Sequence, residues 1–264
     1  MHFTKMHGLG NDYVYLDCTK DIPDGLPELA KRVSDRHFGV GSDGLICICP
    51  SEKADFCMRM FNADGSEGEM CGNGIRCVGK FVYDKGMTNK TSLTVETLAG
   101  IKTLELTVED GKVSAVTVDM GIPHLEEARV ITFQGKEYRG IPVSMGNPHL
   151  VFSVASVKGF DLQIHAPLSI PNPAFPNGVN VEIAEVLASN HILMRVWERG
   201  SGETLACGTG ACATVCACAS QGLTEREATI TLLGGDLHIR WDESDGHVYM
   251  TGPAVTVFEG DWIE

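Results

Sequence analysis

The sequence predicts a strand-rich α+β protein with two halves of similar architecture. Three observations support this class. Apolar and polar residues alternate in many short segments that end in turn residues, which is typical of β-hairpins. Helical patterns are few and do not alternate regularly with strands, which argues against a doubly wound parallel sheet. Matching residues also recur at one fixed spacing of the 264-residue chain.

The predicted strands share period-two alternation and are bounded by Gly, Pro, Asn or Asp. They comprise residues 92–100, 102–111, 112–121, 137–147, 149–154, 191–200, 228–243 and 247–260. Three further segments carry an apolar face at helical spacing and end at glycine. These predicted helices comprise residues 26–39, 74–86 and 210–222.

An internal repeat relates the two halves at an offset of 136 residues, which is the separation of Cys71 and Cys207. Several other identical residues recur at this offset without gaps. They are Arg59 and Arg195, Glu67 and Glu203, Gly72 and Gly208, Gly74 and Gly210, and Asn11 and Asn147. Repeated sequence at a fixed offset indicates repeated structure. We therefore predict halves at residues 1–120 and 121–252, related by a pseudo-two-fold axis.

The composition favours a cytoplasmic protein without a nucleic-acid or membrane partner. The formal net charge of −14 disfavours binding to nucleic acid and to anionic membranes. The N-terminus lacks the apolar run of a signal peptide, and no stretch reaches the roughly 18 apolar residues of a membrane span.

Ten cysteines then need an explanation other than disulfide bonds, since cytoplasmic thiols stay reduced. No Cys-x-x-Cys pair occurs, so the sequence predicts no metal site. Most of the cysteines are expected to be small core residues.

Cys71 and Cys207 are the exceptions, because each precedes a predicted helix and a Gly-x-Gly segment. A helix N-terminus lowers the pKa of a thiol and attracts a carboxylate. If the halves face one another, the two thiols flank one cleft. One thiolate can then remove an α-proton while the opposite thiol protonates the other face, which inverts a stereocentre. No dinucleotide fingerprint or convincing pyridoxal phosphate signature is present, so we expect no cofactor.

Polar residues in loops complete the candidate site. Five asparagines lie in loops flanked by Gly or Pro, namely Asn11, Asn62, Asn73, Asn147 and Asn180. Glu198 is suited to an ammonium group and Arg199 to a second carboxylate. His149 is a candidate for tuning a nearby thiol. A single asparagine among them is better explained by a turn, and His149 alone by packing. The combination of these residues with two related cysteines favours ligand binding.

Five segments of the chain resemble the signatures of the diaminopimelate epimerase family. They are MHGLGNDYV, FNADGSEGEMCGNGIRC, GNPH, PNGVNVE and RVWERGSGETLACGTGAC, which lie in order between residues 6 and 212. The resemblance implies two halves that each wrap a strongly curved mixed sheet around a central helix. It also implies that the C-terminal strand within 253–264 returns to the first half, and that the protein is a cytoplasmic homodimer.

The resemblance further implies cofactor-independent interconversion of LL- and meso-diaminopimelate, in lysine and peptidoglycan precursor biosynthesis. Cys71 and Cys207 are then the acid–base pair, and His149 and Glu198 modulate them. The implied substrate contacts are Asn11, Asn62, Gly72, Asn73, Asn147, Asn180, Glu198, Arg199, Gly208 and Thr209.

Two alternatives stay open at this stage. Proline racemases share paired Cys-Gly motifs, so racemisation of proline or hydroxyproline is the alternative within enzymes. A carboxylate-binding module that keeps the fold without turnover is the alternative outside enzymology. The two are separated by assaying proline and by following solvent deuterium into the α-position.

Overall fold

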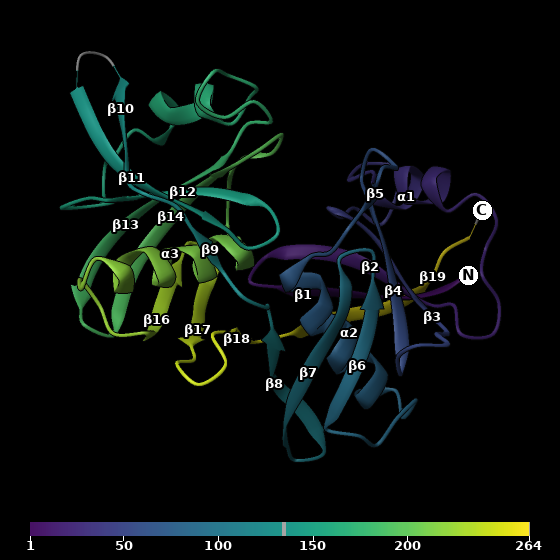
Figure 1. Cartoon of the computed structure of the whole chain (residues 1–264). Coiled ribbons are helices and arrows are strands. Elements are labelled where there is room, and N and C mark those ends of the chain that lie inside the picture. Colours follow the sequence, from purple (N-terminus) through teal and green to yellow (C-terminus); the bar gives the residue numbers. More distant parts are fainter. Residues whose placement is uncertain (134–135, 264) are drawn as a thin grey trace. The chain divides into compact units, whose positions relative to one another are not determined.

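The computed structural model describes residues 1–133 and 136–263, and the chain divides into two compact units. Unit 1 comprises Met1–Val118 and the segment from Gly252 onward, and unit 2 comprises Asp119–Thr251. No helix among the described residues is long and apolar enough to cross a membrane. Mixed β-sheet dominates both units and helices are few, which confirms the predicted α+β class (Figure 1).

Unit 1 contains one mixed sheet with the strand order β19-β1-β2-β3-β4-β6-β7-β8, in which β2–β3 and β4–β6 are parallel pairs. The short strand β5 adds to β4. The bounds are β1 His2–Gly8, β2 Asn11–Asp17, β3 Gly44–Cys49, β4 Phe56–Asn62, β5 Glu67–Gly68, β6 Ser92–Thr97, β7 Gly100–Glu109, β8 Lys112–Asp119 and β19 Val255–Asp261. Its helices are α1 Leu26–Ser34 and α2 Gly72–Asp84.

Unit 2 repeats this order as β10-β11-β12-β13-β14-β16-β17-β18, with parallel pairs at β12–β13 and β14–β16. The short strands β9 and β15 add to β11 and β14. The bounds are β9 His124–Leu125, β10 Arg129–Phe133, β11 Lys136–Ser144, β12 Pro148–Ser153, β13 Asn180–Ala188, β14 His191–Glu198, β15 Gly202–Thr204, β16 Glu227–Leu232, β17 Gly235–Trp241 and β18 Val248–Gly252. Its helices are η1 Leu162–Leu168 and α3 Gly208–Ser220.

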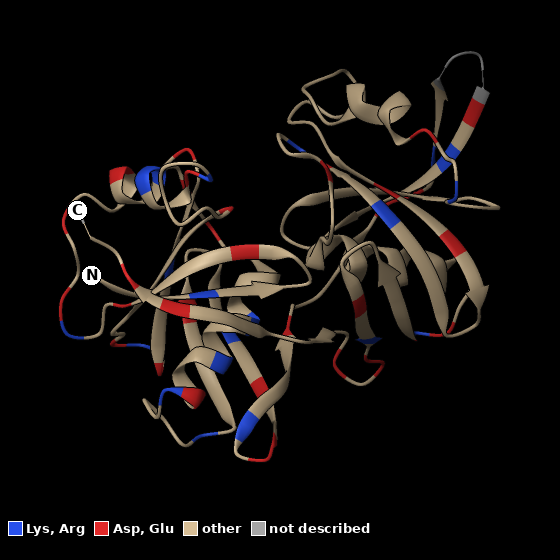
Figure 2. Ribbon diagram, turned by 180° about the vertical axis from the view of Figure 1, so that it is seen from behind, with Lys and Arg blue, Asp and Glu red and all other residues tan. Residues whose placement is uncertain are grey.

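Each sheet curves around one helix. The helix α2 packs against β1 and β2 and also against β7, which lies several strands away in the same sheet. The helix α3 likewise contacts β11–β13 and β16–β17. Strands that are far apart in one sheet can contact the same helix only if the sheet bends around that helix. Since α3 is enclosed in this way, it carries no charged residue (Figure 2), as expected for a helix buried on all sides.

The repeat extends to side-chain contacts. The guanidinium of Arg59 on β4 donates to Glu67 on β5, with Nε 2.8 Å from Oε1. Arg195 on β14 makes the same bond to Glu203 on β15, at 2.6 Å. In both pairs a second nitrogen reaches the other carboxylate oxygen. These bidentate ion pairs hold the short strand that precedes each helix, β5 or β15, against its neighbouring strand.

The predicted helices are present, but their ends differ from the prediction. The structure begins α2 and α3 two residues earlier, directly after Cys71 and Cys207. The helix α1 ends at Ser34 rather than Gly39. The carboxylate of Asp35 accepts hydrogen bonds from the backbone N–H groups of His37 and Phe38, which stabilises a turn in place of further helix.

A buried histidine makes the stability of unit 2 dependent on pH. His165 on η1 is fully buried among the rings of Tyr138, Phe152 and Phe160. Burial lowers the pKa of His165 from 6.5 to about 4, because the charged form loses its hydration.

We expect unit 2 to lose about 2.5 kcal/mol of stability between pH 7.5 and pH 4.5, because the unfolded chain binds a proton there that folded His165 does not. His165→Phe should remove this part of the loss. Urea unfolding of both proteins at the two pH values measures it. An equal pH dependence in the two proteins would contradict the assignment.

Candidate active site

The two helix N-termini that carry Cys71 and Cys207 have the same geometry. Each cysteine is the N-cap residue in an extended conformation, with φ and ψ of −127° and 117° at Cys71 and −124° and 112° at Cys207. Each carbonyl accepts the first helical hydrogen bond, from Ile75 and Ala211 respectively. The helix dipole and the following N–H groups favour a carboxylate at both positions.

The third residue after each cysteine is a glycine that faces a side chain of the neighbouring strand. A Cβ on Gly74 would lie 2.7 Å from Cδ1 of Ile46, and a Cβ on Gly210 would lie 2.7 Å from Oε1 of Glu182. Glycine therefore lets the helix start approach the strand beneath it.

Cys71 is held by polar groups of its own unit. Its thiol donates to Oδ1 of Asn11 at 3.2 Å, and its sulfur accepts from the N–H of Gly74 at 3.3 Å. The amide of Asn11 is oriented by a hydrogen bond from Nδ2 to Asp43 at 2.8 Å. Burial, together with the neighbouring Cys71 and Asp43, raises the pKa of Tyr13 well above its usual value. Tyr13 is therefore a neutral phenol beside the thiol.

The other predicted residues of unit 1 lie at the same end of the sheet. Asn62 ends β4 opposite Gly44, and its Nδ2 donates to the hydroxyl of Ser66 at 3.0 Å. Gly72 and Asn73 form the first turn of α2. The side chain of Asn73 is buried and accepts from the guanidinium of Arg76 at 3.0 Å. The side chain of Asn73 is therefore engaged with Arg76. The link of Asn73 to the site is its position in the first turn of α2.

Cys207 lies at the end of a chain of hydrogen bonds. Its sulfur is 3.6 Å from the hydroxyl of Thr209, which accepts from Nδ2 of Asn147 at 3.2 Å. Oδ1 of Asn147 is 3.1 Å from Nε2 of His149. Nδ1 of His149 is 2.6 Å from Oε1 of Glu182, and both of these side chains are completely buried.

Two carboxylates favour the thiol form of Cys207. Burial raises its pKa well above the usual value, and the negative charges of Glu198 and Glu182 raise it further. Burial also raises the pKa of Glu198, although its carboxylate accepts a hydrogen bond from the hydroxyl of Thr204. Cys207 is therefore in the thiol form in this environment.

Asn180 and Arg199 lie beside one another at the end of β13 and β14. Asn180 is buried, and its Oδ1 accepts from the backbone N–H of Arg199 at 2.9 Å. The exposed guanidinium of Arg199 donates from Nη1 to the carbonyl of Asn177 at 3.0 Å. No carboxylate among the described residues forms an ion pair with Arg199, so its charge is available to an anionic ligand.

The structure thus brings the predicted residues together as one group in each unit. Asn11, Asn62 and Gly72–Asn73 accompany Cys71, and the remaining predicted residues accompany Cys207. The residue that the sequence reasoning missed is Glu182. A signal was present, because Glu182 is a lone acid in the otherwise apolar run NVEIA at the start of β13.

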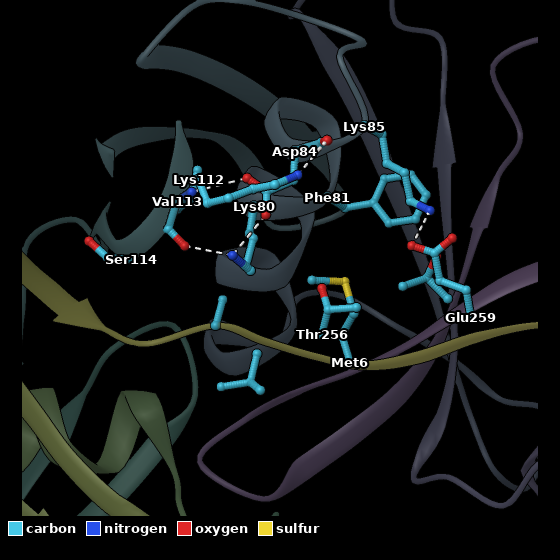
Figure 3. A pocket seen from close by; sticks show the side chains of 13 residues that line it. Met6, Lys80, Phe81, Asp84, Lys85, Lys112, Val113, Ser114, Thr256 and Glu259 are labelled. Atoms are coloured by element: carbon cyan, nitrogen blue, oxygen red, sulfur yellow. Dashed lines mark hydrogen bonds and ion pairs between the residues drawn. The ribbon is translucent and has the colours of Figure 1, made fainter. Parts of the chain in front are cut away.

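A cavity of about 510 Å³ in unit 1 is lined by none of the predicted site residues (Figure 3). It lies between the end of α2 and β19. Two of its lysines are neutralised, since Lys80 pairs with Asp84 at 2.8 Å and Lys85 with Glu259 at 2.6 Å. This cavity gives no indication of a ligand.

Comparison with known proteins identifies the family. A family model described as diaminopimelate epimerase matches residues 3–126 and 141–257. The chain is 57% identical to a diaminopimelate epimerase of Acetivibrio thermocellus, over 99% of this chain and 98% of that protein. It is 56% identical to a diaminopimelate epimerase of Methanococcus maripaludis, over 99% of each chain.

Solved structures of low sequence identity share the fold. A Bacillus anthracis phenazine biosynthesis protein of the PhzF family superposes with a TM-score of 0.76 at 18% identity, covering 100% of this chain and 99% of that one. A hydroxyproline epimerase of Agrobacterium vitis superposes with a TM-score of 0.72 at 16% identity, covering 98% and 90%. These two similarities concern the fold alone. The family model and the close relatives span nearly the whole sequence, and the chain therefore belongs to the diaminopimelate epimerase family.

Proposed function

We propose that this protein is an isomerase that interconverts LL- and meso-diaminopimelate without a cofactor, and so supplies lysine and peptidoglycan precursor synthesis. The observation that carries the proposal is the repeated helix start, since a cysteine caps a glycine-rich helix at equivalent positions of both units. Relatives named diaminopimelate epimerase, more than half identical over nearly the full length, support the choice of substrate. The family resemblance supports a homodimer, and the composition favours a cytoplasmic location.

The proposed reaction is a two-base inversion. The thiolate of one cysteine takes the α-proton, and the electron pair of the broken C–H bond stays on the substrate as a carbanion or enolate. The helix N–H groups at Gly72–Asn73 and Gly208–Thr209 stabilise that charge through the substrate carboxylate. The thiol of the other cysteine then donates its proton to the opposite face of the carbon. The first cysteine is left as thiol and the second as thiolate, so the reverse reaction uses them with exchanged roles.

The second amino-acid centre of diaminopimelate has suitable partners in unit 2. Arg199 is suited to the distal carboxylate, and Glu198 to an ammonium group. The amides of buried Asn180 and half-buried Asn147 offer further hydrogen bonds. A substrate such as proline has no distal carboxylate for Arg199, and the arrangement therefore favours diaminopimelate over proline or hydroxyproline.

Incubation with LL-diaminopimelate in deuterium oxide tests the proposal directly. We expect meso-diaminopimelate that carries deuterium at the inverted α-carbon, because the donor thiol exchanges its proton with solvent before it protonates the product. NMR of the product detects the label, and the same assay with L-proline should show no reaction. Turnover of proline instead would favour the racemase, and binding of diaminopimelate without deuterium uptake would favour a binding module.

A further inference from the structure

Glu182 occupies a place where a charge is unexpected. The equivalent position of unit 1, at the offset of 136, is Ile46. Both side chains face the third residue of a helix, where a Cβ on the glycine would come within 2.7 Å of either one. Packing at this position therefore needs only an apolar side chain. Glu182 is nevertheless completely buried, and burying a carboxylate costs stability unless it is compensated.

The compensation comes from His149, which stands where unit 1 has Tyr13. Nδ1 of His149 and Oε1 of Glu182 are 2.6 Å apart, as expected for a charge-assisted hydrogen bond. Both members of this pair replace uncharged residues of the other unit. The pair is thus specific to the helix start that carries Cys207.

The hydrogen-bond directions lead from this pair to the sulfur of Cys207. Oδ1 of Asn147 can only accept, so the proton between it and His149 sits on Nε2. Nδ2 of Asn147 donates to the oxygen of Thr209. The hydroxyl hydrogen of Thr209 is not used in that bond and can therefore point to Sγ of Cys207, 3.6 Å away.

The carboxylate selects this direction. Because Nε2 of His149 is protonated, the short contact between Nδ1 and Oε1 must also contain a proton, held by one atom or the other. A carboxylate that faces Nδ1 stabilises the doubly protonated ring through its negative charge, so Nε2 keeps its proton as well. Without an acid at position 182, the ring holds a single proton, which can lie on either nitrogen. The amide of Asn147 would then rotate, and its oxygen would accept a hydrogen bond from the hydroxyl of Thr209. That hydroxyl would no longer donate to the sulfur of Cys207.

We propose that Glu182 is a positioning residue that fixes the proton on Nε2 of His149 and so directs the hydroxyl of Thr209 to Cys207. The inference rests on the proposed function. When Cys207 gives up its proton to the substrate, the thiolate that forms meets a hydrogen-bond donor already in place.

The test substitutes Glu182→Gln, which keeps the shape of the side chain but lets either tautomer of His149 be satisfied. We expect kcat for LL-diaminopimelate to fall at least about 10-fold. Losses of this size or larger are typical when a carboxylate that is hydrogen-bonded to a functional histidine is replaced by an amide. KM should change less than about 3-fold, because Arg199, the proposed partner of the distal carboxylate, is unchanged. Glu185→Gln on the same strand is the matched control and should match the parent, since its carboxylate only accepts from the backbone of Val157.

NMR of the histidine ring detects the protons on the nitrogens of His149 without substrate turnover. In protein with ¹⁵N-labelled histidine, we expect both ring nitrogens of His149 to show the chemical shifts of protonated nitrogens, with the proton on Nδ1 shared with Glu182. In Glu182→Gln, we expect one of the two nitrogens to show the shift of an unprotonated nitrogen. The His149→Gln spectrum assigns the signals. Failure of the parent to epimerise would refute the proposed function, while the spectra would still decide the role of Glu182.

A second variant separates the role from packing. The double substitution His149→Tyr with Glu182→Ile installs the residues of unit 1, Tyr13 and Ile46, and should fold with a circular dichroism spectrum like that of the parent. We expect it to lose at least as much kcat as Glu182→Gln. Parental kcat in either variant, or a fall in kcat without any change in the His149 nitrogen signals of Glu182→Gln, would overturn the proposal.

Discussion

Epimerisation of LL-diaminopimelate should fall by roughly 10³-fold or more in Cys71→Ala and in Cys207→Ala, because each substitution removes one member of the acid–base pair. A coupled assay of meso-diaminopimelate measures the loss, and NMR in deuterium oxide measures α-proton exchange separately. The two variants should fail equally in both reaction directions, since each direction uses both cysteines.

The comparison with serine separates chemistry from folding. The sulfur of Cys71 accepts from the N–H of Gly74 as a helix cap, so alanine there also costs about 1 kcal/mol of stability. Cys71→Ser restores a capping oxygen but not a thiol, and should fold like the parent while epimerising far more slowly. Cys57→Ala, at a half-buried cysteine of β4, is the control and should keep full activity. Full activity in either alanine variant of the pair would rule out the two-base mechanism.

Arg199→Met should raise KM for diaminopimelate about 100-fold, because it removes a charge-assisted hydrogen-bond donor to the distal carboxylate. The effect on kcat should be smaller, since the guanidinium does not touch the reacting carbon in the proposed mechanism. Arg199→Lys should recover only part of the loss, because an ammonium cannot form the two parallel hydrogen bonds. Initial rates over a range of substrate concentrations separate the two constants.

Arg139→Met provides the matched control for this loss. Arg139 is an exposed arginine on β11 of the same unit, and its removal changes the net charge equally. It should leave KM within about 2-fold of the parent. An unchanged KM in Arg199→Met, or an equal rise in both variants, would show that Arg199 does not recognise the distal carboxylate.

The repeat was the most productive signal in the sequence. The offset of 136 residues relates the bounds of α2 to those of α3 at both ends, as well as the ion pairs of Arg59 and Arg195. It works because residues that pack one helix into one curved sheet must keep their spacing for that fold to form again. Identical spacing of Cys, Gly and Arg therefore implied identical architecture.

Fully buried strands were harder to predict than exposed ones. β3 consists of GLICIC, and all six of its residues are buried. Such a strand has no polar face and therefore no alternation, which is the pattern on which strand prediction depends. Hairpin strands such as β7 and β8 alternate because one face meets solvent, and these the sequence did predict.

Local composition was sufficient for the residue types of the candidate site, because a thiol at a glycine-rich helix start and asparagines in tight turns follow from short-range sequence. The difference between the two cysteines was not accessible in this way. Besides burial and the charge of Glu198, it arises from the pair of Glu182 and His149. These two residues are 33 positions apart and meet only because β12 and β13 pair in parallel. The protonation of a buried group depends on the charges and hydrogen bonds that surround it in space, and those neighbours are brought together by the folded sheet.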